Sequence, residues 1–135
     1  MSLFKVFDIS GSALHAQSVR LNTTASNMAN VDSISSSTAT TYRSRQPVFS
    51  AQMDEAGEEA SGVNVLGIVE SQAPLQRQYR PDHPLADKAG YVNLPNVNPV
   101  EEMANMISAS RSYQSNVEVL NTSKQMLMRT LALGE

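Results

Sequence analysis

The sequence contains no cysteine and no tryptophan, and only 5% of its 135 residues are aromatic. The lack of cysteine excludes a disulfide framework and any metal site with thiolate ligands. The shortage of aromatic side chains argues against a large compact core, because these residues bury the most apolar area per side chain. At this length a single domain is expected, with few side chains available to fill its interior.

A basic cluster is also missing. The net charge is −3 at pH 7, and the ten lysines and arginines are scattered along the chain. We therefore expect neither nucleic acid nor anionic lipid as a partner. No stretch approaches the roughly 20 apolar residues of a transmembrane helix, so direct membrane insertion is not expected. The first residues lack the basic and apolar regions of a cleavable secretory signal.

Motifs for catalysis or cofactor binding are absent as well. The sequence has no nucleophile–base pattern and no phosphate-binding glycine loop. Asp82, His83 and Asp87 cluster around prolines, a composition more typical of a surface turn than of a metal site. Glu101 and Glu102 are adjacent, so on a helix they point in different directions and make a poor acid–base pair. We expect no enzyme activity, no cofactor and no metal.

The dominant feature of the sequence is a helical pattern between Asn98 and Leu131. Alternating steps of three and four residues from Met103 fall mostly on apolar side chains, which is the heptad pattern of a helix that faces a partner. Pro99 suits the first helical position, with Asn98 as its N-cap. At about 1.5 Å per residue this helix would be about 50 Å long, so it needs an extended partner. The positions expected on its packing surface are Met103, Met106, Tyr113, Val117, Leu120, Leu127 and Leu131.

A second helical pattern, over residues 3–31, supplies that partner. Its apolar side chains recur every seven residues, but the other heptad position is polar, and Gly11 costs about 1 kcal/mol in helix propensity relative to alanine. An antiparallel hairpin is the simplest arrangement, and aligning the helices end to end sets Leu21 near Val117 and Leu120. The apolar packing positions are Phe7, Leu14, Leu21 and Met28, and the polar ones are Ser10, Gln17 and Thr24.

The middle of the chain is expected to hold a loop and a small β module. Residues 32–41 are rich in serine and threonine and read as a loop. Val63, Val65 and Ile68 are expected to be buried within the module. Its expected pieces are an extended segment at 42–49, an acidic turn at 54–62, and strands at 63–69, 76–79 and 90–94.

The predicted fold is mainly α with a small β module. Residues 1–35 and 98–135 form an antiparallel pair of long terminal helices, and residues 36–97 form an irregular β-rich insertion that joins them. Two classes of function fit this fold. One is a polymer subunit whose helices pack against copies and relatives, and the other is a helical binding or chaperone-like module that holds one client. A helically arranged assembly would indicate the first class, and a finite stoichiometric complex the second.

Two stretches of the sequence resemble bacterial flagellar rod and hook proteins. The first runs from Arg20 to Ser33, and its core is Ala25, Ser26, Asn27, Met28, Ala29 and Asn30. The second lies between Tyr79 and Gly134 and narrows the resemblance to a component of the rod. It comprises residues 79–87, 90–92, 94–97, 102–114 and 116–134.

The resemblance implies a structural subunit of the proximal part of the flagellar basal-body rod, in the periplasm. It implies export by the flagellar type III apparatus without cleavage of a signal, and contacts with other rod proteins and with copies of the chain in a helical assembly. In this family the paired terminal helices pack into a tubular inner layer, which forms a torque-transmitting shaft. The family motif residues are Ala25, Ser26, Asn27 and Asn30.

Overall fold

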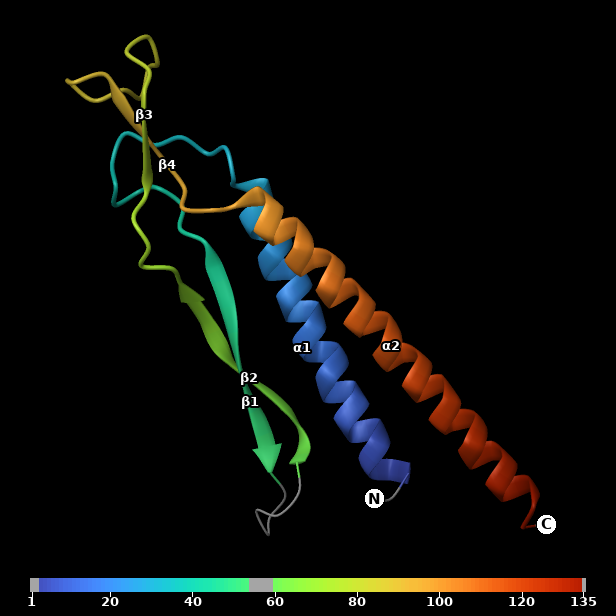
Figure 1. The fold of residues 1–135 in the computed structure, drawn as a ribbon. Coiled ribbons are helices and arrows are strands. Elements are labelled where there is room, and N and C mark those ends of the chain that lie inside the picture. The colour runs from blue at the N-terminus through green and yellow to red at the C-terminus, as the bar shows by residue number, and fades with distance from the viewer. Residues whose placement is uncertain (1–2, 54–59, 135) are drawn as a thin grey trace.

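The computed structural model describes residues 3–53 and 60–134, which form two helices and two small antiparallel sheets. Helix α1 (Leu3–Ala29) and helix α2 (Pro99–Ala132) run side by side in opposite directions, so the two ends of the chain lie at the same end of the pair (Figure 1). The predicted mainly α fold with an antiparallel helix pair is therefore confirmed. The expected acidic turn spans residues 54–62. Residues 54–59 lie outside the described residues, and residues 60–62 form the start of strand β2 (Ala60–Glu70), so that part of the prediction is wrong.

Helix α2 begins where the sequence indicates. The side-chain oxygen of Asn98 accepts hydrogen bonds from the backbone N–H groups of Val100 at 3.1 Å and Glu101 at 3.4 Å. Pro99 occupies the first helical position, where its missing N–H costs nothing. Glu101 in the first turn and Arg129 in the last have the signs that the helix dipole favours.

The contact between the helices involves small and polar side chains more than apolar ones. On α2 the buried residues are Glu102, Ala109 and Ser123. At about 100° per residue, the centre of the predicted apolar line lies roughly 60° away from them around the helix. Met103 at the start of that line is 53% exposed, and Leu131 near its end is 66% exposed. The buried residues of α1 are Ser10, Ala16, Thr23, Thr24 and Asn27.

Two hydrogen bonds fix how the helices are aligned. The amide nitrogen of Asn27, in the last turn of α1, donates to Oε1 of Glu102 in the first turn of α2 at 3.0 Å. A guanidinium nitrogen of Arg20 donates to Oδ1 of Asn105 at 3.2 Å. The end of α1 therefore lies beside the start of α2.

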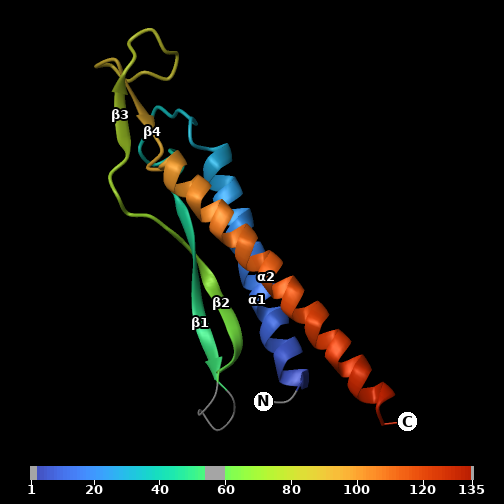
Figure 2. The same cartoon turned by 45° about the vertical axis from the view of Figure 1, so that its right-hand side comes forward.

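This alignment contradicts the predicted register. The end-to-end alignment that set Leu21 near Val117 and Leu120 is wrong by about three helical turns. It assumed that the helices coincide at the end that carries the chain termini. They coincide instead at the opposite end, and the 34-residue α2 extends past the start of the 27-residue α1 (Figure 2).

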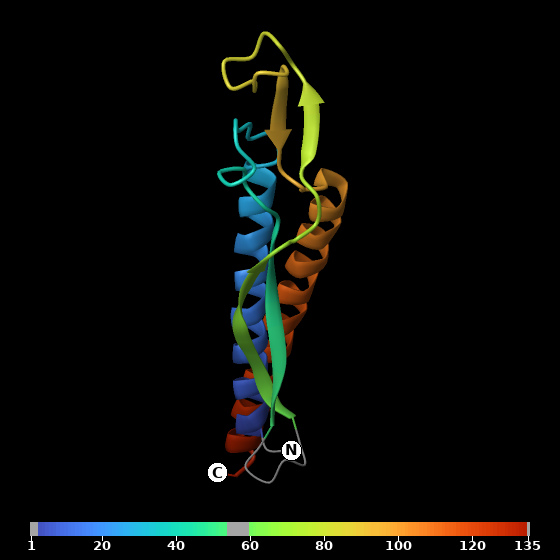
Figure 3. The same ribbon diagram turned by 90° about the vertical axis from the view of Figure 1, so that its left-hand side faces the viewer.

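The first sheet is a hairpin of β1 (Arg45–Met53) and β2 (Ala60–Glu70), which lies against α1 (Figure 3). The hairpin is hydrogen-bonded to Ser12 of α1. The Ser12 hydroxyl group accepts a hydrogen bond from the backbone N–H of Val63 at 3.0 Å and donates one to the carbonyl of Ile9 at 2.8 Å. A Cβ atom on Gly62 would lie 2.7 Å from that oxygen. The lack of a side chain at Gly62 therefore allows the close approach of β2 to α1.

Burial in this hairpin differs in part from the prediction. Val63 and Val65 are half-buried, but Ile68 is 53% exposed, so its predicted burial is wrong. Within the described residues the sheet has two strands, and the helix that contacts it is α1, so one face is left uncovered there.

The second sheet pairs β3 (Gln76–Tyr79) with β4 (Tyr91–Leu94) beyond the end of the helix pair. Val92 is fully buried, and Val97 is buried just before α2 begins. The predicted loop is fastened here, because Ser35 and Asn93 exchange two backbone hydrogen bonds of 3.1 and 3.0 Å. This small core holds the β3–β4 hairpin on the entrance to α2.

Candidate assembly interface

Asn27 of the family motif is the centre of a polar joint between three elements. It is 1% exposed, and its amide group pairs with the backbone of Arg45 in β1 as a neighbouring strand would. The Arg45 N–H donates to Oδ1 at 2.9 Å, and Nδ2 donates to the Arg45 carbonyl at 2.8 Å. The Tyr42 hydroxyl also donates to Oδ1, at 2.8 Å, and Nδ2 donates to Glu102. One side chain therefore connects α1, β1 and α2.

Glu102 is the acidic partner in this joint and is only 5% exposed. Burial raises the pKa of its carboxyl group, and the charge of neighbouring Glu101 acts in the same direction, while hydrogen bonds from Asn27, Thr24 and Ser44 oppose them. The sequence indicated Glu102 only as a first-turn carboxylate. Its position instead makes it part of the contact between the helices.

The rest of the motif closes the end of α1. The hydroxyl groups of Ser26 and Tyr42 lie 3.1 Å apart in a hydrogen bond. The Asn30 side chain donates to the Ser26 carbonyl at 2.8 Å, beside the 3.2 Å hydrogen bond from the Asn30 backbone N–H to the same carbonyl. Ala25 is exposed. The motif residues therefore have different surroundings. Asn27 lies in the joint, Ser26 and Asn30 form hydrogen bonds at the end of the helix, and Ala25 is exposed to solvent.

The side-chain amide of Asn96 is hydrogen-bonded to the backbone just before β1 and to the backbone after β2. Its Oδ1 accepts the N–H of Ser44 at 2.8 Å, and its Nδ2 donates to the carbonyl of Ala73 at 2.9 Å. Arg43 adds a bond of 3.1 Å to the carbonyl of Ser71. Sequence reasoning missed Tyr42, Ser44 and Asn96. Short polar side chains beside strand ends were the available signal, since they often satisfy backbone groups there.

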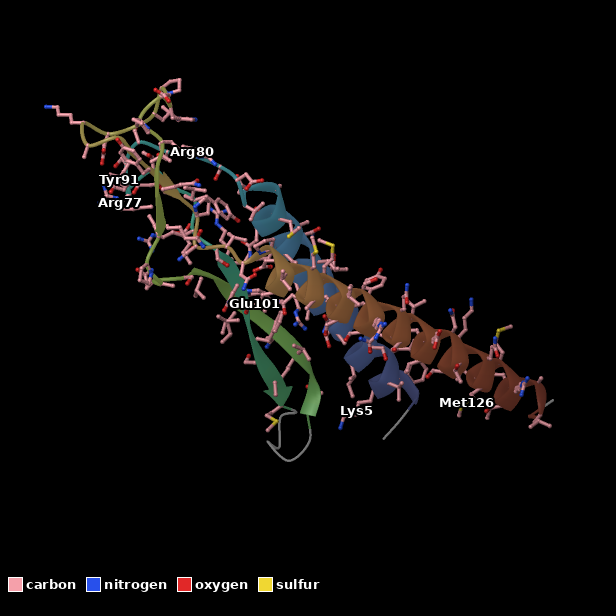
Figure 4. The ribbon with its side chains drawn as sticks, turned by 45° about the horizontal axis from the view of Figure 1, so that its top comes forward. Lys5, Arg77, Arg80, Tyr91, Glu101 and Met126 are labelled. Atoms are coloured by element: carbon pink, nitrogen blue, oxygen red, sulfur yellow. The ribbon has the colours of Figure 1, made fainter. Side chains whose placement is uncertain are left out.

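The β3–β4 end carries the charged cluster that the sequence draws attention to. Arg77 forms a 2.8 Å ion pair with Asp87, and its guanidinium lies over the Tyr91 ring at 4.8 Å. The pKa of Asp87 is lowered, chiefly by the hydrogen bond from the backbone N–H of Tyr91. Burial is the next largest effect and raises it, and the N–H of Ala89 and the charge of Arg77 lower it further. Arg77 and Tyr91 stand together at this end in Figure 4.

Asp82 and His83 do not converge with Asp87 on a common point that could hold a metal. The Nδ1 atom of His83 accepts the N–H of Leu85 at 3.1 Å. Within residues 3–53 and 60–134, no group of three or more histidine, aspartate or glutamate side chains is arranged to bind a metal ion. The same residues include no helix long and apolar enough to cross a membrane.

The predicted apolar line of α1 lies on the side of the helix away from the β1–β2 hairpin. Ser12 faces that hairpin, and Val19 and Ser26 line a small cleft with Ile68 of β2. Leu14, Leu21 and Met28 each follow one of these three residues by two positions. At about 100° per residue, they therefore lie about 200° further around the helix. Among the predicted positions of both helices, Met103, Tyr113 and Leu131 are exposed, and the half-buried ones are Phe7, Leu14, Leu21, Met28, Met106, Val117, Leu120 and Leu127.

Both ends of the chain match families of flagellar rod proteins. Residues 7–33 match the family described as "Flagella basal body rod protein", and residues 88–133 match "Flagellar basal body rod FlgEFG protein C-terminal". These ranges cover most of α1 and all of α2, the two helices that carry Asn27, Glu102 and the apolar lines. The fold and the two matches define the chain's class as a structural protein of the flagellar basal-body rod.

Full-length relatives narrow this class to one family. The flagellar basal-body rod protein FlgC of Salmonella typhimurium is 54% identical over 136 residues, that of Yersinia enterocolitica 53% over 135, and that of Buchnera aphidicola from Acyrthosiphon pisum 44% over 138. Each alignment covers 100% of both chains. The chain belongs to the FlgC family of flagellar basal-body rod proteins. It is a structural subunit of the rod, and the predicted resemblance to rod proteins is confirmed.

Proposed function

We propose that the subunit polymerises in the proximal rod through the apolar lines of its two terminal helices. The observation that carries this proposal is the incomplete burial of those lines in the single chain: Met103, Tyr113 and Leu131 are exposed, and the other positions are half-buried. The buried residues of α1 and α2 are instead mostly small and polar. An extended apolar surface on one face of a molecule marks a protein–protein contact. The proposed interface consists of Phe7, Leu14, Leu21, Met28, Met103, Met106, Tyr113, Val117, Leu120, Leu127 and Leu131.

The two parts of the chain have different roles in this proposal. Residues 1–35 and 98–135 form the inner helical layer, and residues 36–97 brace the helices from the other side. The position of the β1–β2 hairpin supports this division, because it contacts α1 on the face away from the apolar line. The apolar face therefore stays accessible to neighbours while the hairpin remains attached.

The neighbours in the proposed assembly are other rod proteins and further copies of the chain, arranged helically in the periplasm. The assembly is mechanical: side-by-side helices transmit torque along a shaft without chemical turnover. Delivery through the flagellar type III export apparatus, without cleavage of a signal, belongs to the same proposal. A chaperone-like module for one client is not favoured, because the chain matches rod proteins along its whole length.

Charge substitutions on the apolar line of α2 test this function. Leu120→Asp and Leu127→Asp place a carboxylate in an apolar contact, which costs about 3–5 kcal/mol when the charge is buried without a partner. We expect both variants to be lost from purified basal bodies and to abolish swimming in a strain that lacks the natural subunit. Both side chains are only half-buried in the single chain, so circular dichroism of the free variants should still report a folded subunit.

Thr122→Asp is the matched control, since Thr122 is exposed on the polar face of the same helix. It should assemble like the natural chain. A normal rod built from Leu120→Asp or Leu127→Asp subunits would show that the apolar line of α2 is not an assembly surface.

A further inference from the structure

The carboxyl group of Glu102 occupies an unusual position for a first-turn glutamate. First-turn acidic side chains are usually solvated, where they interact with the helix dipole at little cost. Glu102 instead points into the joint and accepts a hydrogen bond from the Asn27 amide at 3.0 Å. The hydroxyl groups of Thr24 from α1 and Ser44 from the segment before β1 also lie against it. The carboxyl group of α2 therefore contacts both α1 and the segment that leads into β1.

The charged groups around Glu102 do not neutralise it. Arg20 of α1 and Arg45 of β1 line the same cleft, of about 350 Å³, together with Glu101. The guanidinium of Arg20 donates to Asn105. The guanidinium of Arg45 pairs with Glu70 at 3.3 Å and lies over the ring of Tyr42. Glu101 adds a charge of the same sign.

We propose that Glu102 is a proton-sensitive lock, which holds α1, α2 and the start of β1 together most tightly when its carboxyl group is protonated. The hydrogen bonds survive protonation. The oxygen that faces Asn27 remains an acceptor, and the new O–H can donate to the hydroxyl oxygen of Thr24 or Ser44. What protonation removes is the cost of burying a charge and the repulsion from Glu101.

The sign of the pH dependence follows from the direction of the pKa shift. Burial raises the pKa of Glu102 in the folded chain above its ordinary value of 4.5. Such a group stabilises the fold fully below its unfolded pKa, and that contribution is lost as the pH rises through the folded pKa. The joint is therefore tightest in mild acid and looser at neutral pH. This property belongs to the free subunit and does not depend on how the rod assembles.

Glu102→Gln mimics the protonated side chain and gives the first test. We expect its urea unfolding midpoint at pH 7 to exceed that of the natural chain, and the two midpoints to converge as the pH falls below the ordinary pKa of 4.5. Glu118→Gln, which changes an exposed glutamate of α2, is the control. Its unfolding midpoint should differ from that of Glu102→Gln by as much as the natural chain's does, with the same dependence on pH. Parallel curves for the natural chain and Glu102→Gln, or a Glu102→Gln midpoint below the natural one at pH 7, would overturn the proposal.

A titration of the natural chain tests the proposal without any variant. The side-chain carboxyl carbon of Glu102, followed by NMR as the pH is varied, should titrate at a higher pH in the folded chain than in the urea-unfolded chain. As the pH falls through the same interval, hydrogen exchange of the backbone amides around Asn27 and Arg45 should slow, after correction for the intrinsic pH dependence of exchange. A folded titration midpoint at or below the unfolded one would refute the lock.

Discussion

At the residue scale, hydrogen bonds from amide and hydroxyl side chains hold α1, β1 and α2 together at the joint, where an apolar core would be expected. Asn27 satisfies two backbone groups of Arg45, the Tyr42 hydroxyl and a buried carboxylate at once. Each such bond contributes about 1 kcal/mol net, but removing the shared partner strands several buried groups together. A single side chain therefore contributes to all the contacts that join α1, β1 and α2 at this point.

Asn27→Ala is expected to lower the free energy of unfolding of the free subunit by about 2–4 kcal/mol, because the Arg45 N–H and Glu102 lose their partner in a buried site. Chemical denaturation monitored by circular dichroism would measure the loss. Asn22→Ala, at an exposed position of the same helix, is the control and should change the value by about 0.5 kcal/mol or less. Equal effects of the two substitutions would show that the joint contributes little to stability.

The importance of this residue could be predicted from the sequence, but its chemistry could not. The motif marked Asn27 and Asn30, and the heptad pattern marked Thr24 as a polar position within a packing line. Which groups they satisfy depends on Tyr42, Arg45 and Glu102, which approach only after the chain has folded back. Spacing along one helix holds no information about these distant partners.

At the element scale, periodicity located both helices, and the β-branched run at residues 63–69 located most of β2. Helix α2 starts at Pro99 behind an Asn98 cap, as predicted. The register of the helix pair could not be predicted in the same way. A heptad pattern shows which face of a helix is apolar, but it does not show whether that face meets the other helix of the same chain or a neighbouring subunit.

The docking of the β1–β2 hairpin on α1 gives a prediction at this scale. A methyl group added by Gly62→Ala would lie 2.7 Å from the Ser12 hydroxyl oxygen, which two hydrogen bonds hold in place. We expect a loss of about 1–3 kcal/mol from this overpacking. Hydrogen exchange should quicken in β2 and in the facing part of α1.

Gly11→Ala provides the control, because no atom lies within 4 Å of the methyl group that it would add. Its higher helix propensity should raise the stability by about 0.5–1 kcal/mol. If Gly62→Ala were as stable as Gly11→Ala, then the hairpin would not pack on α1 as closely as the structure shows.

At the scale of the whole molecule, the helix pair has two dissimilar faces. One carries the β1–β2 hairpin, and the other carries apolar side chains that no other part of the described chain buries completely. Helix α2 also continues beyond the start of α1, which leaves apolar residues of its last turns exposed, Leu131 among them. The shape is that of a subunit whose packing is completed by its neighbours.

An electron cryo-microscopy map of basal bodies built from this chain tests that claim most directly. We expect Met103, Tyr113 and Leu131, all exposed in the single chain, to lie within about 4.5 Å of apolar atoms of neighbouring rod subunits. The joint of Asn27 with Glu102 should be unchanged within each subunit. A map in which these three side chains face solvent in the assembled rod would contradict the account.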